Sequence, residues 1–194
     1  MMYSNIFDNL VEIQLEFSSE KYTNIFKDKN NKTLKETLVD KRYISLKDEV
    51  YKKYNQFLNI KLGTFLFNLK NDGDLFYKKF LNEYGDLEYN NFKITNKNYL
   101  DIKGVYFYFL DDRLKYIGRC RDNMKKRVNS GYGQISPKKC YKDGQSTNCK
   151  VNSLISKNIN SIKLKIFIMD NNEEIEIFES KLIKKFSPNW NCNK

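Results

Sequence analysis

The stretch GVYFYFLDDRLKYIG, residues 104–118, predicts a β-hairpin. Two aromatic-rich segments flank a charged DDR turn, which is typical of paired strands. Side chains alternate between the faces of a strand, so a three-residue turn would place Tyr108 opposite Tyr116 and Tyr106 opposite Gly118. We therefore expect the tyrosines to gather on one face, with a gap at Gly118 that a bulky ligand could enter. Aromatic residues that merely cover a sheet would give the same pattern.

The residues beyond the hairpin predict a small α+β module around it. Helices are expected from Asp122 and from about Ser146, followed by a third strand at residues 162–169, IKLKIFIM. A last helix should begin near Asn172 and end before Pro188, which cannot continue it. The predicted fold class is α+β, with a small central antiparallel sheet of about three strands flanked by helices and a mainly helical N-terminal extension.

The first hundred residues follow a different pattern. TLKE at Thr33 and SLKD at Ser45 each place a hydroxyl three residues before an acid, which predicts two helix starts. The segment VEIQLEF, residues 11–17, alternates strictly, and the sequence leaves open whether it forms a strand. We expect two regions, residues 1–100 and residues 101–194.

Positive charge is concentrated in the second region. Residues 1–100 carry 16 Lys and Arg against 14 Asp and Glu, whereas residues 101–194 carry 19 against 10, for a net charge of +11. Such a surface attracts polyanions, so nucleic acid is the first partner to expect and anionic lipid the second. No apolar run approaches the roughly 20 residues of a membrane span. We expect a cytoplasmic protein that acts away from the membrane.

Histidine and cysteine usage narrows the metal chemistry. The chain has no histidine, and its four cysteines lack the close spacing of a zinc knuckle. Free thiols in a reducing compartment are the simplest interpretation. Any metal should be held by carboxylate oxygens.

One acid of the last helix falls on its apolar face. At about 100° per residue the apolar side chains form one stripe: Ile175, Phe178, Leu182, Ile183 and Phe186. Glu179 lies near the middle of this stripe. A carboxylate facing a core costs several kcal/mol unless a cation or a metal neutralises it. A salt bridge to Arg119, Arg121 or Arg127 and a divalent metal both meet this need, and the sequence does not choose between them.

These residues resemble the motifs of the GIY-YIG nuclease superfamily. The matching elements, in the family's order, are GVY (104–106), YIG (116–118), Arg127, Glu179 and Asn191. The segment from residue 131 to 155, GYGQISPKKCYKDGQSTNCKVNSLI, is further similar to the branch that contains type II restriction endonucleases.

The resemblance implies a role for each matched residue. Tyr106 would act on the attacking water, with Tyr116 as its partner, and Arg127 would contact the scissile phosphate. Glu179 would hold one divalent ion per active site, Mg²⁺ or Mn²⁺, and Asn191 would support the site.

The general base stays open, because many members carry a histidine shortly after the arginine and Tyr132 stands near that place here. Other residues are expected to contact DNA through phosphates or base edges: Arg119, Arg121, Lys138, Lys139, Gln145, Asn148 and Lys150. For the DGQST segment, residues 143–147, a turn and helix cap at Ser146 or Thr147 is the alternative.

The function implied by the resemblance is metal-dependent, sequence-specific cleavage of double-stranded DNA, as in a type II restriction enzyme acting as a homodimer on a palindromic site. Residues 101–194 would be the catalytic module, and residues 1–100 would supply DNA wrapping or dimer contacts. A homing or DNA-repair nuclease of the same superfamily is one alternative. A basic nucleic-acid-binding protein without catalysis is another.

Overall fold

The computed structural model describes residues 6–191 and divides into two compact units. Within the described chain, unit 1 comprises residues 6–20, 90–134 and 154–191, and unit 2 comprises residues 21–89 and 135–153. The chain therefore crosses between the units four times. None of the crossings coincides with the boundary that the sequence suggested at residue 100.

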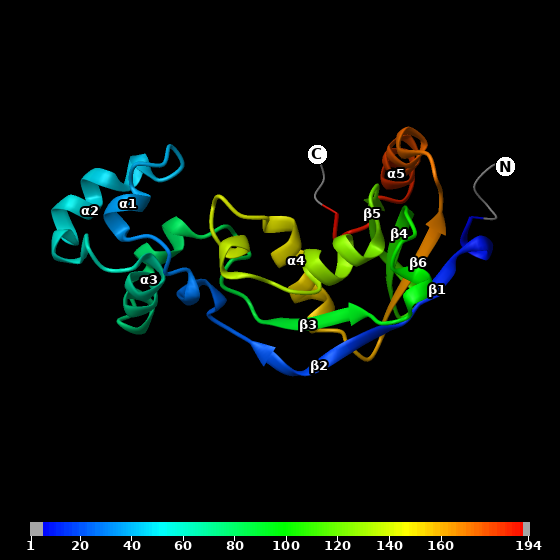
Figure 1. The fold of residues 1–194 in the computed structure, drawn as a ribbon, viewed down its shortest axis with the longest axis horizontal. Helices are drawn as coiled ribbons and strands as arrows, with labels where there is room; N and C mark the ends of the chain where they lie inside the picture. Colours follow the sequence, from blue (N-terminus) through cyan, green and yellow to red (C-terminus); the bar gives the residue numbers. More distant parts are fainter. Residues whose placement is uncertain (1–5, 192–194) are drawn as a thin grey trace. The chain divides into compact units, whose positions relative to one another are not determined.

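Unit 1 is an α+β unit built on a four-stranded antiparallel sheet (Figure 1). The strands are β1 (Val11–Ile13), β4 (Gly104–Leu110), β5 (Arg113–Cys120) and β6 (Ile162–Ile168), in the order β1-β6-β4-β5. The expectation of about three strands is therefore corrected to four. The additional strand, β1, comes from the segment whose structure the sequence left open, and it pairs with β6.

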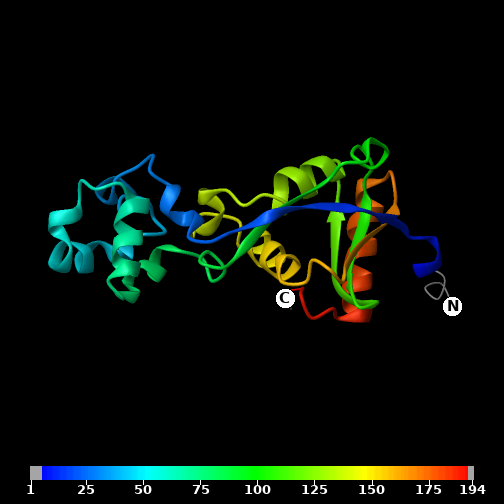
Figure 2. The same ribbon diagram turned by 90° about the horizontal axis from the view of Figure 1, so that it is seen from below.

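A second, two-stranded sheet is formed by β2 (Leu15–Tyr22) and β3 (Tyr89–Ile94). Figure 2 shows that β2 continues the path of β1. The Asn90 side chain of β3 links the two strands, because its Nδ2 donates hydrogen bonds to the β2 carbonyls of Ser18 and Glu20 at 2.9 and 2.8 Å.

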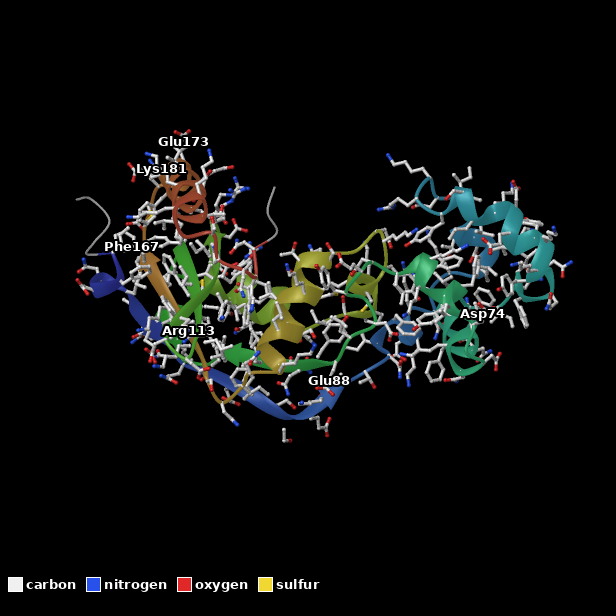
Figure 3. The ribbon with its side chains drawn as sticks, turned by 180° about the vertical axis from the view of Figure 1, so that it is seen from behind. Asp74, Glu88, Arg113, Phe167, Glu173 and Lys181 are labelled. Carbon is white, nitrogen blue, oxygen red and sulfur yellow. The ribbon has the colours of Figure 1, made fainter. Side chains whose placement is uncertain are left out.

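The helix α5 (Asn172–Phe186) packs on one face of the sheet of unit 1 (Figure 1). Its start and end follow the prediction, since Asn171 caps the N-terminus and the chain leaves the helix at Ser187 with φ of 42°. Figure 3 shows Glu173 and Lys181 on the outer side of this helix. The core between the helix and the sheet contains the buried apolar residues Ile6, Val105, Phe107, Ile117, Ile175 and Leu182.

The turn of the β4–β5 hairpin differs from the prediction, but its tyrosines have the predicted register. The turn has two residues, Asp111 and Asp112, both at positive φ, and Leu110 pairs with Arg113. A bulge between Tyr108 and Phe109 then shifts the pairing by one residue, to the register that a three-residue turn would have produced. Tyr108 faces Tyr116 and Tyr106 faces Gly118, as expected.

Two further helical segments connect these elements. A π-helix spans Lys125–Tyr132, where the sequence predicted an α-helix from Asp122, and its backbone is non-helical at Gly131. The helix α4 (Ser146–Ser156) begins where predicted and runs across the division between the units. Short 3-10 helices occur at Phe7–Asn9 and Lys97–Tyr99.

Unit 2 contains short helices around an aromatic core. The α-helices lying wholly in this unit are α1 (Leu34–Thr37), α2 (Lys47–Lys53) and α3 (Leu62–Asn71). The 3-10 helices are Ile25–Asp28, Ile44–Leu46, Asn55–Phe57, Leu75–Phe80 and Pro137–Cys140. Among the described residues, no helix is both long and apolar enough to cross a bilayer.

One of the two predicted helix starts is confirmed. Thr33 and Glu36 form a reciprocal capping box at α1. The start at Ser45 is wrong, because Ser45 lies inside a 3-10 turn and α2 begins only at Lys47. The aromatic residues that fill the core next to these helices outweigh a local capping signal.

Candidate functional site

Four tyrosines of unit 1 form one cluster. Tyr106 and Tyr108 come from β4, Tyr116 from β5 and Tyr132 from the end of the π-helix. The ring centroid of Tyr106 lies 6.1 Å from that of each of the other three. Tyr106, Tyr108 and Tyr132 are fully buried, and Tyr116 is 6% exposed. The structure thus confirms that the hairpin tyrosines gather on one face, and it adds Tyr132 to them.

Arg127 enters this cluster from the π-helix. Its Nε donates a hydrogen bond to the Tyr106 hydroxyl at 3.0 Å. Its guanidinium lies 5.8 Å from the ring centroid of Tyr106 and 5.5 Å from that of Tyr132. The Tyr106 phenol raises the pKa of Arg127, and the π faces of the two rings also favour the charged guanidinium. Arg127 is therefore a fixed cation within an aromatic cage.

The phenols themselves are neutral in this arrangement. Burial raises the pKa values of Tyr106 and Tyr132 well above the ordinary 10, although the charge of Arg127 acts in the opposite direction. A cation near a phenol favours the phenolate, and Arg127 supplies one, but the loss of solvent around Tyr106 outweighs it. Tyr106 in this state donates or accepts hydrogen bonds rather than acting as a base.

Gly118 does not provide an open gap. A Cβ atom added at this position would lie 2.3 Å from the Tyr106 hydroxyl and 2.4 Å from its Cζ atom. The space left by the missing side chain is filled by the ring of Tyr106 itself. The expectation that a bulky ligand enters beside Gly118 is therefore corrected: the glycine allows Tyr106 to cross β5 toward Arg127.

Glu179 is neutralised by Arg119, one of the three arginines that the sequence suggested as its partner. Arg119 Nη1 lies 2.8 Å from Glu179 Oε2 and 3.2 Å from Glu176 Oε1. Arg121 Nη1 binds the other oxygen of Glu176 at 3.1 Å. Burial raises the pKa of Glu179 above its ordinary 4.5, and the charge of Arg119 opposes that rise. The salt-bridge alternative is thus realised in this structure.

The tyrosine cluster and the Glu179 salt bridge lie on opposite faces of the hairpin. Arg119 pairs with Val105, whose side chain packs under α5, whereas Tyr106 and Tyr116 point to the other face. β5 is an edge strand, so groups of the two faces meet around it. Glu179 accordingly interacts electrostatically with both Tyr116 and Arg127. The charge of Glu179 is thus felt on the tyrosine face of the hairpin, although the two groups lie on opposite faces.

Asn191 fastens the segment after α5 to this edge. Its Oδ1 accepts a hydrogen bond from the Ile117 amide at 2.9 Å, and its Nδ2 donates one to the Ile117 carbonyl at 2.8 Å. The Trp190 amide donates to the Lys115 carbonyl at 2.9 Å. These bonds occupy the free backbone groups of an edge strand. Asn191 therefore fixes the strand between Tyr116 and Gly118 rather than contacting the tyrosines.

Glu176 is a member of the site that the sequence analysis missed. Glu176 lies off the apolar stripe of α5, and its side chain is 50% exposed. It nevertheless binds Arg119 and Arg121 together. Its position three residues before Glu179 on the same helix was the available signal, since residues so spaced lie side by side.

Within the described chain, Glu179 is the one carboxylate of the candidate site that is placed to bind a divalent ion. Among residues 6–191 no group of three or more Asp, Glu, Cys or His side chains is placed to hold a metal. Mg²⁺ keeps several waters and commonly takes one or two carboxylates together with substrate phosphates, so Glu179 alone is a sufficient protein ligand. Arg119 must release Glu179 Oε2 before an ion binds there.

Cys120, Cys140 and Cys149 are free and buried, as the sequence suggested. Cys192 lies outside the described residues.

The remaining predicted DNA contacts lie in unit 2, on the segment 135–153. Lys138 is exposed, and Lys139 is half-buried, with its pKa lowered by that burial. Lys150 Nζ lies 5.7 Å from the ring centroid of Tyr84. Asn148 is buried and donates to the exposed Gln145 side chain, which favours a structural role for Asn148 at the start of α4. Helix α4 begins directly after Gln145, so neither Ser146 nor Thr147 is the cap residue.

Asp143 anchors that segment to the rest of unit 2. Its Oδ1 accepts hydrogen bonds from the Tyr43 hydroxyl at 2.8 Å and from Lys29 Nζ at 3.2 Å. Burial alone would raise the pKa of Asp143, but these two bonds outweigh it and hold the pKa below the ordinary 3.8.

Replacing Asp143 with Asn is expected to lower the free energy of unfolding by about 1–3 kcal/mol at pH 7. Because the pKa is lowered on folding, the carboxylate stabilises the fold above pH 3.8, and this contribution is lost as the pH falls through the folded value. Urea denaturation at pH 7 and near pH 3 measures the difference, with the exposed Asp28→Asn as control. A loss of the same size at both pH values would contradict this account.

Comparison with known proteins finds no matching family model, no matching curated protein and no matching solved structure. The likeness to a nuclease family rests on the motif residues alone.

Proposed function

We propose that the chain is a metal-dependent DNA endonuclease that hydrolyses phosphodiester bonds in double-stranded DNA, most closely of the type II restriction kind. The observation that supports this proposal best is the hydrogen bond from Arg127 to Tyr106 at 3.0 Å within the tyrosine cluster, next to a half-buried carboxylate. The motif residues, far apart in the sequence, all belong to unit 1, and those of the second motif lie on its edge strand β5.

Each group has a chemical task in this proposal. A divalent ion on Glu179, Mg²⁺ or Mn²⁺, supplies charge stabilisation and a polarised water. The guanidinium of Arg127 stabilises the negative charge that develops on the phosphate. Tyr106 fixes the orientation of Arg127 through its hydroxyl, and Tyr116, which is slightly exposed, is the phenol closest to solvent. The proton of the attacking water would pass to a phenolate of the cluster that forms on DNA binding, or through a second water to bulk solvent.

The proposal requires two local changes. Arg119 must leave Glu179, and a DNA phosphate is the natural replacement partner, because a guanidinium binds phosphate oxygens in the same bidentate manner as a carboxylate. The tyrosine cluster must also open at Tyr116, since Tyr106 and Tyr132 are fully buried. Both changes would involve side chains of β5, which is an edge strand and has a neighbouring strand on one side only.

A second candidate function is DNA binding without cleavage. The Arg119–Glu179 salt bridge and the complete burial of Tyr106 favour it, because both are what a purely structural cluster would show. A homing or repair nuclease is a third possibility within the same chemistry.

Incubation with supercoiled plasmid, with and without Mg²⁺, separates these functions. The proposal predicts discrete fragments that require the metal and are lost in Glu179→Gln. Retarded but intact DNA would establish the binding function instead. Mapping of the fragment ends distinguishes a restriction enzyme, with one short palindromic site, from the other nucleases, and sedimentation with DNA tests the homodimer that a palindrome implies.

Replacing Arg119 with Ala is expected to increase the affinity of the protein alone for Mn²⁺ by about tenfold, because the variant frees an oxygen of Glu179 and removes a neighbouring positive charge. Isothermal titration with Mn²⁺ measures this. Arg121→Ala is the matched control, since Arg121 binds Glu176 but has no ion pair with Glu179 among the described residues. Equal affinities in the wild type and Arg119→Ala would place the metal elsewhere.

A further inference from the structure

The positive charge of the chain belongs mainly to unit 2 once the segments are assigned by the fold. The residues of unit 2 carry 18 Lys and Arg against 11 Asp and Glu, a net charge of +7. The described residues of unit 1 carry 16 against 13, a net charge of +3. The segment 135–153 accounts for part of this difference, because it brings 4 Lys and a single acid, Asp143, into unit 2. The unit without the motif residues is therefore the more positive of the two.

Asp143 joins segments of unit 2 that lie about a hundred residues apart in the sequence. It accepts hydrogen bonds from Lys29 Nζ at 3.2 Å and from the Tyr43 hydroxyl at 2.8 Å. Lys29 Nζ also lies 4.0 Å from the ring centroid of Tyr141, whose hydroxyl donates to the Phe26 carbonyl at 2.9 Å. The side chains of Lys29 and Asp143 are 13% and 14% exposed. Largely buried contacts thus hold these segments in one arrangement.

Three exposed cations surround this junction, namely Lys32, Arg42 and Lys138. Burial lowers the pKa of Lys29 despite Asp143, and the charges of Lys138 and Lys32 lower it further, so both ammonium groups lie near Lys29. Arg42 interacts electrostatically with Asp143 and precedes the anchored Tyr43 in the chain. We call the three exposed cations the Lys32–Lys138 surface. They come from three segments that the fold brings together.

The acids next to the Lys32–Lys138 surface are already bound by protein groups. Asp143 is held by Lys29 and Tyr43, and Asp40 by the guanidinium of Arg42 at 2.9 and 2.7 Å. Arg42 keeps further N–H donors after this pairing. Neither Lys32 nor Lys138 forms an ion pair with a described residue. Their ammonium groups are therefore available to an external anion.

Resting on the proposed function for the choice of polyanion, we propose that the Lys32–Lys138 surface binds the phosphate backbone of duplex DNA. Cations spread over an anchored surface suit a partner with regularly repeated phosphates, and each contact releases counterions from the duplex. A lysine contacts a phosphate as a point charge and carries no sequence information. Unit 2 accordingly supplies affinity that is independent of sequence, apart from the candidate active site in unit 1.

The local structure favours DNA over an anionic membrane as the partner. Basic sites that bind lipid commonly lie on amphipathic helices or beside a membrane span. Lys32 and Arg42 lie in bends and turns, and Lys138 lies in a 3-10 helix of four residues. Such segments present cations at separate points of a folded surface, which matches phosphates along a duplex.

The test measures the Kd of the full-length protein for two duplexes of unrelated sequence over a range of salt concentrations, with Ca²⁺ in place of Mg²⁺. Lys32→Gln/Lys138→Gln is expected to weaken binding about tenfold or more at low salt, equally for both sequences. The slope of log Kd against log salt should fall by about two, one for each phosphate contact removed.

Lys181→Gln/Lys184→Gln is the matched control, because it removes the same charge from exposed positions of α5 in unit 1. Figure 3 shows Lys181 on the outer side of that helix. The control should change the slope by less than about 0.5. An equal fall in the two double variants would show that net charge, and not the Lys32–Lys138 surface, determines the affinity.

The outcomes separate this proposal from the nuclease. An unchanged slope in Lys32→Gln/Lys138→Gln, or a loss confined to one of the two sequences, overturns the phosphate surface and leaves cleavage untouched. A reduced slope without cleavage in the plasmid assay retains the surface and overturns the nuclease. Binding of the wild type to phosphatidylserine vesicles but not to duplex DNA overturns both. If the double variant melts more than about 4 °C below the wild type, Lys138→Gln alone is measured, with an expected change in slope of about one.

Discussion

Replacing Tyr106 with Phe is expected to reduce DNA cleavage by about 100- to 1000-fold while leaving DNA binding within about twofold of the wild type. The substitution keeps the buried ring and removes only the hydroxyl that accepts the hydrogen bond from Arg127 Nε. Without that bond the guanidinium is free to rotate away from the phosphate. The half-buried Nε also loses its partner, so the free energy of unfolding should fall by about 1–3 kcal/mol. Single-turnover cleavage and urea denaturation measure the two effects separately.

Tyr108→Phe is the matched control for this experiment. Tyr108 is as buried as Tyr106 and belongs to the same strand, but its hydroxyl makes no hydrogen bond to a described residue. Removing a buried hydroxyl without a partner should leave the stability unchanged or raise it, and cleavage should remain within about threefold. Equal losses of cleavage in the two variants would show that the hydroxyl of Tyr106 has no particular role.

Gly118→Ala is expected to damage both the fold and the activity. The new Cβ would lie 2.3 and 2.4 Å from two atoms of the Tyr106 side chain, and the surrounding tyrosines leave that ring no space to retreat. Overpacking of this kind costs about 1–3 kcal/mol, and occasionally more. Any displacement of the ring also breaks its contact with Arg127, so cleavage should be lost together with stability. Urea denaturation and the plasmid assay measure the two losses.

A double-mutant cycle identifies the cause of that loss. On a Tyr106→Ala background the clash with the Tyr106 ring is removed and only a 2.8 Å approach to Tyr116 Cε1 remains. Gly118→Ala should therefore cost less there than in the wild type, with a coupling free energy of about 1 kcal/mol or more. Equal costs on the two backgrounds would mean that Gly118 is required for its own backbone rather than for Tyr106.

The sequence predicts the hairpin register correctly for a partly wrong reason. Alternation fixes which residues share a face, and it therefore placed Tyr106, Tyr108 and Tyr116 together. The turn length is not encoded as strongly, since DDR suits either two or three residues. In the structure Asp111 and Asp112 form a two-residue turn, and a bulge compensates for it. The buried tyrosine face determines the register, and the turn adapts to it.

The need for a charge partner at Glu179 is also predictable, but its identity is not. Helical periodicity places this acid against the core, and burial then demands a cation. Arg119 lies on β5 and Arg121 follows the last residue of that strand, and continued alternation would put both on the α5 face. Only the packing of α5 on the sheet brings Arg119 to Glu179 and leaves Arg121 to Glu176. That geometry depends on contacts between elements about 60 residues apart, which local patterns do not contain.

Local sequence patterns also fail to predict that residues 11–13 join the sheet of unit 1 and that residues 135–153 belong to unit 2. The segment VEI has the alternation of a strand, but its partner, the edge of β6, is formed by residues about 150 positions later in the chain. The segment 135–153 belongs to unit 2 because of Tyr141 and Asp143, whose partners Phe26 and Tyr43 precede them by about a hundred residues. Neither placement follows from composition or periodicity.

The fourfold passage of the chain between its two units has a practical consequence. No single cut yields either unit intact: a fragment that starts at residue 101 lacks β1 and retains 135–153 without the residues that surround it. Replacement of the N-terminal part alone would therefore disrupt both units at once. Changes to one unit that keep the other intact are therefore limited to substitutions of individual side chains or to segments between two neighbouring crossings.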